Sequence, residues 1–242
     1  MIGKWIEAIR YPGGVPVKAG SKQPASFYAF CRSLWRGIFA CTMRVKCAGL
    51  ETLNAKDGMV IAVSHVSHLD PVVMSVVTSR KISWVSRIEF YRYWPMRTVL
   101  YLGGALRVDR QGSAIPTIRE GLRRLARGEA VGIFPEGELM CGEQSVLRGA
   151  RVKQGVCTLA AWSGKPVVPV IVLGTHRLVN IGPWLPAKRG RLWVYVGAPM
   201  FAGPGARTHA GRAEFAAALE AEYVRLYAKA REAFKLDESI VP

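Results

Sequence analysis

The sequence has no hydrophobic run long enough to form a helix that spans a bilayer. None of its 242 residues belongs to an uninterrupted apolar stretch of about 18 residues, the length such a helix requires. Residues 1–20 also lack the apolar core of roughly 7 to 15 residues and the small-residue cleavage site of a secretory signal. We therefore expect a protein that touches a membrane without crossing it.

Acidic side chains are scarce. The chain has 17 Asp and Glu residues against 34 Lys and Arg residues, so its formal net charge is +17. A charge of this size indicates anionic partners, and both nucleic acid and the surface of an acidic lipid membrane meet that description. Charge alone therefore leaves a nucleic-acid-binding protein and a lipid enzyme equally open.

Cysteine spacing offers no framework for disulfides or zinc. The five cysteines form no C-x-x-C pair and no paired Cys/His pattern; they are Cys31, Cys41, Cys47, Cys141 and Cys157. This pattern favours a reducing, cytosolic setting and predicts no metal site.

Short β-branched runs alternate with segments of helical periodicity along most of the chain. With 50% hydrophobic residues, the chain can bury one substantial core. The expected strands lie at residues 44–47, 59–63, 82–86, 105–108, 130–134, 167–173 and 192–196. The alternation predicts an α/β fold with a mostly parallel central sheet flanked by helices, closed by a helix at about 209–234.

The segment 27–41 has the spacing of an amphipathic helix. Its apolar positions recur every three or four residues, while Arg32 and Arg36 lie on the opposite side. Aromatic rings on one face and cations on the other suit a helix at a lipid headgroup boundary, but packing against a core explains the pattern equally well. We expect an N-terminal helical segment for membrane association at 1–43 and an α/β domain at 44–242.

Polar residues follow the expected strand at 59–63. His65 and Asp70 come directly after it, and sites in open α/β sheets are built at the carboxyl ends of strands. Asp70 precedes Pro71, a pattern that predicts a helix N-cap at Asp70. A carboxylate bonded to Nδ1–H of a histidine leaves Nε2 free to remove a proton from a hydroxyl. The alternative is that Asp70 only caps a helix while His65 and His68 are ordinary loop residues.

Three further blocks follow the His65–Asp70 motif in order. They are Gly103–Arg110, Phe134–Gly137 and Val168–Val170. Together the four blocks, between about Val45 and Pro199, resemble the glycerolipid acyltransferase family, which includes the bacterial 1-acylglycerol-3-phosphate acyltransferases.

The resemblance implies roles for particular residues. His65 would be the general base and Asp70 its orienting partner. The residues implied in substrate binding are Ser67, Arg110, Glu136, Gly137 and Lys153, with the Arg110 guanidinium gripping the acceptor phosphate. In the family, Thr and Arg usually follow the third block, whereas Glu138 and Leu139 stand here. The departure weakens the case for lysophosphatidate and leaves lyso-ornithine lipid and glycerol-3-phosphate open as acceptors.

The predicted reaction transfers a fatty acyl group from acyl-CoA or acyl carrier protein to the free hydroxyl of a lysophospholipid. The first choice of acceptor is 1-acyl-sn-glycerol-3-phosphate, which would give phosphatidic acid. The sequence has no G-x-S-x-G elbow and no cysteine close to His65, so we expect direct attack without an acyl-enzyme, a metal or a cofactor. The expected location is peripheral, on the cytoplasmic face of an anionic membrane.

A nucleic-acid-binding protein remains the rival from a different functional class. Arginines alternate with Trp, Tyr and Phe between residues 87 and 97. No recognisable binding module accompanies them, so nucleic acid is not the expected partner.

Overall fold

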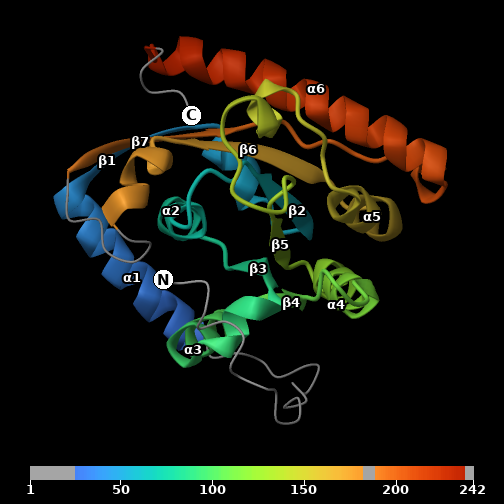
Figure 1. The fold of residues 1–242 in the computed structure, drawn as a ribbon, viewed down its shortest axis with the longest axis horizontal. Helices are drawn as coiled ribbons and strands as arrows, with labels where there is room; N and C mark the ends of the chain where they lie inside the picture. Colours follow the sequence, from blue (N-terminus) through green and yellow to red (C-terminus); the bar gives the residue numbers. More distant parts are fainter. Residues whose placement is uncertain (1–24, 182–188, 238–242) are drawn as a thin grey trace.

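The computed structural model describes residues 25–181 and 189–237. Its centre is a seven-stranded sheet with the order β1-β7-β6-β2-β5-β3-β4 (Figure 1). The strands are β1 (Met43–Ala48), β2 (Met59–Val63), β3 (Ile82–Arg87), β4 (Leu106–Val108), β5 (Ala130–Ile133), β6 (Val167–Leu173) and β7 (Gly190–Val196). Neighbouring strands are parallel except for β6 and β7. The predicted α/β fold with a mostly parallel sheet is confirmed.

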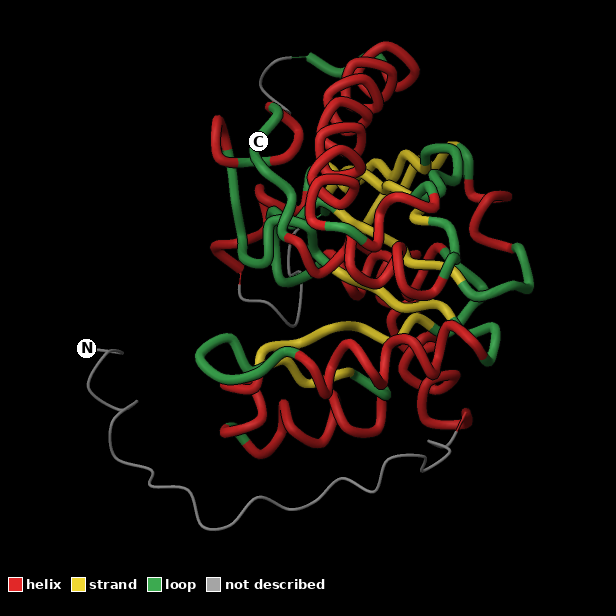
Figure 2. Tube along the Cα trace, turned by 90° about the vertical axis from the view of Figure 1, so that its right-hand side faces the viewer, coloured by secondary structure: helices red, strands yellow, loops and turns green. Residues whose placement is uncertain are grey.

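Helices cover both faces of this sheet. The α-helices are α1 (Ala25–Thr42), α2 (Asp70–Val77), α3 (Trp94–Gly103), α4 (Ile115–Ala126), α5 (Gln154–Ser163) and α6 (His209–Phe234). Short 3-10 turns are η2 (Leu50–Asn54), η3 (Ile88–Arg92), η4 (Gly142–Gln144), η5 (Val146–Arg148), η6 (Thr175–Ile181) and η7 (Pro204–Arg207). Helix α6 runs along one side of the sheet and α1 and α2 lie on the other, so the strands are enclosed between helices (Figures 1 and 2).

Strand β2 shows why its residues form a buried inner strand. Successive side chains of a strand point to opposite faces, and every residue of β2 is apolar and buried. Val60 and Ala62 pack into the core beneath α5 and α6, whereas Ile61 and Val63 pack into the core beneath α1 and α2. This double burial fixes the strand whose carboxyl end begins the polar loop at Ser64.

Helix α1 both packs against the core and exposes apolar side chains, so it has features of each interpretation of its amphipathic pattern. Phe39 is buried in the core with α2, and the Arg36 guanidinium donates to the carbonyl of Val76 at 3.0 Å. By contrast, Phe30 is 66% exposed and Leu34 is 52% exposed. Within the described residues, no helix combines the length and hydrophobicity that crossing a bilayer requires. Residues 1–24 lie outside the described part, and the boundary between 43 and 44 stays a prediction.

Candidate active site

The loop after β2 is tied to its neighbours by backbone hydrogen bonds on two sides. The Ser64 N–H donates to the carbonyl of Val170 at 3.0 Å, and the Ser64 hydroxyl accepts from the Val172 N–H at 3.2 Å. The Met140 N–H donates to the carbonyl of His65 at 2.9 Å. These bonds hold the backbone of His65 between β6 and the loop that follows β5.

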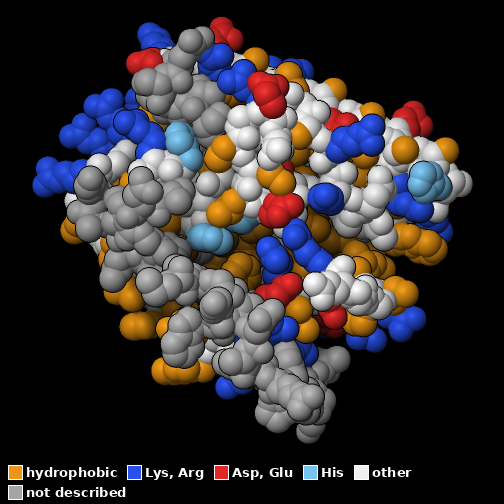
Figure 3. Space-filling view, in the orientation of Figure 1, with side chains coloured by type: hydrophobic (Ala, Val, Ile, Leu, Met, Phe, Trp, Pro, Cys, Tyr) orange, Lys and Arg blue, Asp and Glu red, His pale blue; other side chains and the backbone are white. Residues whose placement is uncertain are grey.

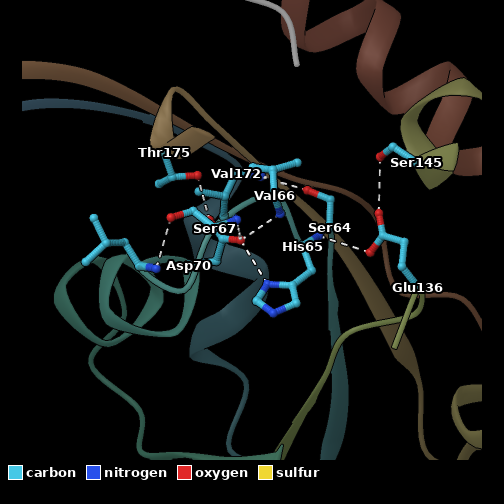
Figure 4. A network of polar contacts seen from close by, with 10 residues as sticks. Ser64, His65, Val66, Ser67, Asp70, Glu136, Ser145, Val172 and Thr175 are labelled. Atoms are coloured by element: carbon cyan, nitrogen blue, oxygen red, sulfur yellow. Dashed lines mark hydrogen bonds and ion pairs between the residues drawn. The ribbon is translucent and has the colours of Figure 1, made fainter. Parts of the chain in front are cut away.

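The Asp70 carboxylate is fully buried and has a hydrogen-bond donor on every side (Figure 4). Its Oδ2 lies 3.0 Å from Nδ1 of His65 and accepts the N–H groups of Val66 and Ser67, each at 2.9 Å. Its Oδ1 accepts the hydroxyl of Thr175 at 2.6 Å. The carboxylate that the sequence pairs with His65 therefore does meet the imidazole.

The predicted N-cap at Asp70 is wrong. Leu69 already has helical dihedral angles, φ −81° and ψ −13°, so α2 begins one residue earlier than expected and Asp70 lies inside its first turn. No side chain caps this helix. The carboxylate turns back toward the loop because the amides of Val66 and Ser67 and the Thr175 hydroxyl converge there. The alternative in which Asp70 serves only as a cap fails for the same reason.

The His65 ring is held by stacking as well as by Asp70. It lies on Phe134 with 3.7 Å between ring centroids and 16° between planes, and Phe134 in turn lies on Trp84 at 4.9 Å and 10°. The side chain keeps 12% exposure. Nε2 has no hydrogen-bond partner among the described residues, and in Figure 4 it points away from Asp70. A ring fixed on one nitrogen with the other free is the arrangement of a general base.

Glu136 supports the site from behind. It is buried, its Oε2 accepts the His65 N–H at 3.0 Å, and its Oε1 accepts the Ser145 hydroxyl at 3.1 Å and the Val146 N–H at 3.3 Å. Burial disfavours the charged form and raises the pKa of Glu136 to about 7, although these three donors act in the opposite direction. Its carboxyl group thus connects the His65 backbone to η5.

This raised pKa makes stability depend on pH. A carboxyl group that binds its proton more tightly in the folded state stabilises the protein below its unfolded pKa of about 4.5 and loses that contribution as pH rises to about 7. We expect the free energy of unfolding to fall by up to about 3 kcal/mol over this window relative to Glu136→Gln, which cannot titrate. Urea unfolding at pH 4.5, 6 and 7.5 measures the difference.

The matched control for this comparison is Glu143→Gln, the same substitution at an exposed carboxylate in η4. Its unfolding free energy should follow the wild type at each pH. A pH-independent difference between wild type and Glu136→Gln would contradict the account of the Glu136 carboxyl group.

Three of the residues implied in substrate binding lie together beside the His65–Asp70 pair. The Arg110 guanidinium donates to the carbonyl of Gly137, and the Lys153 N–H donates to the carbonyl of Pro135 at 2.9 Å. Gly137 has φ +76°, and a Cβ there would lie 2.8 Å from the Arg110 guanidinium and 3.5 Å from Lys153 Cγ. A side chain at 137 would therefore displace the Arg110 guanidinium and touch the Lys153 side chain at ordinary contact distance; both cations belong to exposed residues. Their charges can bind an anion there.

The side chains of Ser67 and Glu136 form hydrogen bonds to other groups of the protein. The buried Ser67 hydroxyl accepts from the Leu69 N–H at 3.2 Å and thus shapes the turn before α2. Glu136 bonds three groups of the chain. A substrate contact for either residue stays a prediction, as do the roles of the other site residues.

His68 lies close to the pair without joining it. Its ring meets His65 edge-on, with 6.3 Å between centroids, and meets Phe90 in the same way at 6.1 Å. Burial, and to a lesser extent the charge of the nearby His65, lowers the pKa of His68. The neutral imidazole is therefore favoured at this position.

Thr175 and Ser145 were missed from the sequence. Thr175 is buried just past the end of β6, the neighbour of β2, so the rule that sites gather at the carboxyl ends of parallel strands could have singled it out. Ser145 lies in the long connection after β5, where no pattern distinguishes it from other loop serines.

The model of the Acyltransferase family matches residues 44–173 of this chain. A curated relative, the 1-acyl-sn-glycerol-3-phosphate acyltransferase of Bacillus subtilis, is 28% identical over 174 residues, which cover 72% of this chain and 82% of the relative. A chloroplastic relative of the same name from Brassica napus is 24% identical, and only about half of its length, 51%, is covered.

One solved structure has a similar fold. The 1-acyl-sn-glycerophosphate acyltransferase PlsC of Thermotoga maritima superimposes with a TM-score of 0.61 at 17% identity, covering 84% of this chain and 78% of that one. At that identity the similarity establishes the fold.

Proposed function

This chain belongs to the acyltransferase family, and on that premise we propose that it transfers a fatty acyl group from a thioester to the free hydroxyl of a lysophospholipid. The observation that carries the proposal is the 3.0 Å contact between His65 Nδ1 and the buried Asp70 carboxylate, with Nε2 left free. The names of the curated relatives support 1-acyl-sn-glycerol-3-phosphate as the acceptor and phosphatidic acid as the product. The acyl donor is acyl-CoA or acyl carrier protein.

In the proposed mechanism, Asp70 accepts the hydrogen bond from Nδ1–H of His65, and Nε2 removes the proton of the lysolipid hydroxyl. The hydroxyl oxygen attacks the thioester carbonyl, the carbon–sulfur bond breaks, and the thiol leaves with the proton from the imidazolium. Asp70 stabilises that imidazolium while it exists.

The surroundings of Cys141 support direct attack over an acyl-enzyme. Cys141 is an exposed thiol two residues beyond the Glu138-Leu139 pair, and the N–H of its neighbour Met140 donates to the carbonyl of His65. Burial, and to a lesser extent the charges of Asp70 and Glu136, raises the pKa of this thiol. Since a thiolate is the nucleophilic form of cysteine, this shift lowers the fraction of Cys141 that could attack a thioester.

Arg110 and Lys153 are proposed to bind the acceptor phosphate. Arg110→Gln is therefore expected to raise KM for lysophosphatidate about tenfold or more and to change kcat much less, because the lost guanidinium contacts a part of the acceptor that does not react. Thiol release from a long-chain acyl thioester at varied lysophosphatidate measures both constants.

A matched control is Arg119→Gln, which removes one exposed charge from α4 and should leave KM unchanged. Lyso-ornithine lipid and glycerol-3-phosphate are the comparison acceptors, because Glu138 and Leu139 replace the residues usual in the family. An unchanged KM in Arg110→Gln would place the acceptor phosphate elsewhere.

Peripheral attachment to an anionic membrane on its cytoplasmic face is part of the proposal. The exposed Phe30 and Leu34 of α1 supply apolar contact, and the net charge of +17 supplies attraction to acidic lipid. No nucleic acid is expected as a partner.

A further inference from the structure

A second basic site lies at the edge of the sheet where β2 and β6 end, beyond Thr175. A cavity of about 760 Å³ opens where the end of α1 meets the starts of β1 and β7 and the turn η6. Four arginines line it: Arg44, Arg177, Arg189 and Arg191. None of the described residues that line this cavity is an aspartate or a glutamate.

The arrangement of these arginines is unfavourable for the protein alone. Arg44 and Arg191 stand directly opposite each other in the parallel pairing of β1 with β7, and both are exposed. Like charges opposite one another on paired strands are destabilising. No carboxylate in the described part of the chain forms an ion pair with either of them. Figure 3 shows basic side chains gathered at the left, where Figure 1 places β1 and β7.

Buried apolar side chains line part of the cavity. Met43, Leu178 and Trp193 line it and are buried. Gly174, with φ +89°, passes so close to β7 that a Cβ would strike the carbonyl of Arg191 and lie 3.1 Å from the Trp193 ring. This close approach constrains the path of the chain into η6, the turn that carries Arg177.

We infer that this cavity binds the phosphate group of an anionic ligand at a site separate from Arg110 and Lys153. Several guanidinium groups around one concave surface suit phosphate, since each can donate two parallel hydrogen bonds to its oxygens. Phosphate would also neutralise the opposed charges of Arg44 and Arg191. The ligand is either the headgroup of an anionic phospholipid or a soluble phosphate compound, and both present the same chemistry.

The cavity is connected to the catalytic pair through one residue. Gly174 lines the cavity, and the next residue, Thr175, donates its hydroxyl to Asp70. The phosphate would therefore lie on the side of Asp70 opposite to His65, away from the reacting nitrogen. Binding there does not depend on acyl transfer, so the inference can fail while the proposed function holds.

Equilibrium dialysis with inorganic pyrophosphate tests the inference. The test variant is Arg177→Gln/Arg191→Gln, and the control is Arg119→Gln/Lys229→Gln, which removes the same charge from exposed positions on α4 and α6. The cavity variant should bind pyrophosphate at least about tenfold more weakly than the control. Both double variants are compared in the Arg110→Gln background, which weakens the acceptor site, so that the remaining pyrophosphate binding reports on the cavity. Thermal unfolding checks that both double variants fold, as expected at exposed positions.

Vesicle flotation then distinguishes the two sources. If the ligand is a lipid headgroup, the cavity variant should bind vesicles of phosphatidylcholine with phosphatidylglycerol more weakly than the control, and pyrophosphate should compete with those vesicles for the wild type. If the ligand is soluble, vesicle binding should match the control while pyrophosphate binding is lost. Equal pyrophosphate binding by the two double variants, or no saturable binding by the wild type, would overturn the inference.

Discussion

His65→Ala is expected to lower kcat for acyl transfer by a factor of about 10² to 10⁴, the range that general acid–base catalysis contributes. The imidazole is oriented by Asp70 at 3.0 Å and by stacking on Phe134. Steady-state thiol release at saturating lysophosphatidate measures the loss.

The control for this substitution is His209→Ala, at an exposed position at the start of α6. It should retain the wild-type rate. A His65→Ala enzyme with a rate within about threefold of the wild type would remove this imidazole from the mechanism.

Asp70→Ala is expected to cost both activity and stability. The change leaves the N–H groups of Val66 and Ser67 and the hydroxyl of Thr175 without their acceptor in a buried site. Each buried donor left unsatisfied costs about 1–3 kcal/mol, so a loss of about 3–5 kcal/mol in the free energy of unfolding is expected, with kcat reduced by about 10² or more. Urea unfolding and thiol release measure the two effects.

Asp57→Ala provides the comparison, since the side chain of Asp57 is 89% exposed and its contact with Lys165 spans 3.9 Å. That variant should stay within about 0.5 kcal/mol of the wild type. If Asp70→Ala were equally mild, the hydrogen bonds around its carboxylate would not be supporting the loop.

The sequence was most informative where structure depends on neighbouring residues. The bounds predicted for the strands at 59–63 and 167–173 and for the helix at 209–234 agree with β2, β6 and α6, because each is a sustained apolar pattern. The contact between His65 and Asp70 could also be predicted, because the two residues are only five positions apart in the chain.

Features that depend on segments far apart in the chain could not be predicted from the sequence. Thr175 is 105 residues from Asp70 in the chain, and the Glu136 oxygens bond both to the His65 backbone and to η5. The antiparallel placement of β7 beside β6 also escaped prediction, because a strand's apolar pattern is the same in either direction. The N-cap error arose because the pattern Asp-Pro does not report where the donors of the preceding loop point.

Among the residues implied in binding, the chain places Arg110 and Gly137 in direct contact and Lys153 next to them. That convergence required the blocks after β4 and β5 to meet at one edge of the sheet, which the sequence could indicate only through the order of the motifs. The long-range packing that forms the arginine cavity had no comparable signal, because its residues come from α1, β1, η6 and β7.

The most direct test of the central claim follows thiol release and product formation together in the wild-type protein. A long-chain acyl thioester is supplied with and without 1-acyl-sn-glycerol-3-phosphate. Mass spectrometry then measures the masses of the lipid product and of the intact protein. The account predicts thiol release that depends on the acceptor, one phosphatidic acid formed per thiol, and a protein of unchanged mass. Thiol release at the same rate without acceptor, or a stable acyl group on the protein, would contradict it.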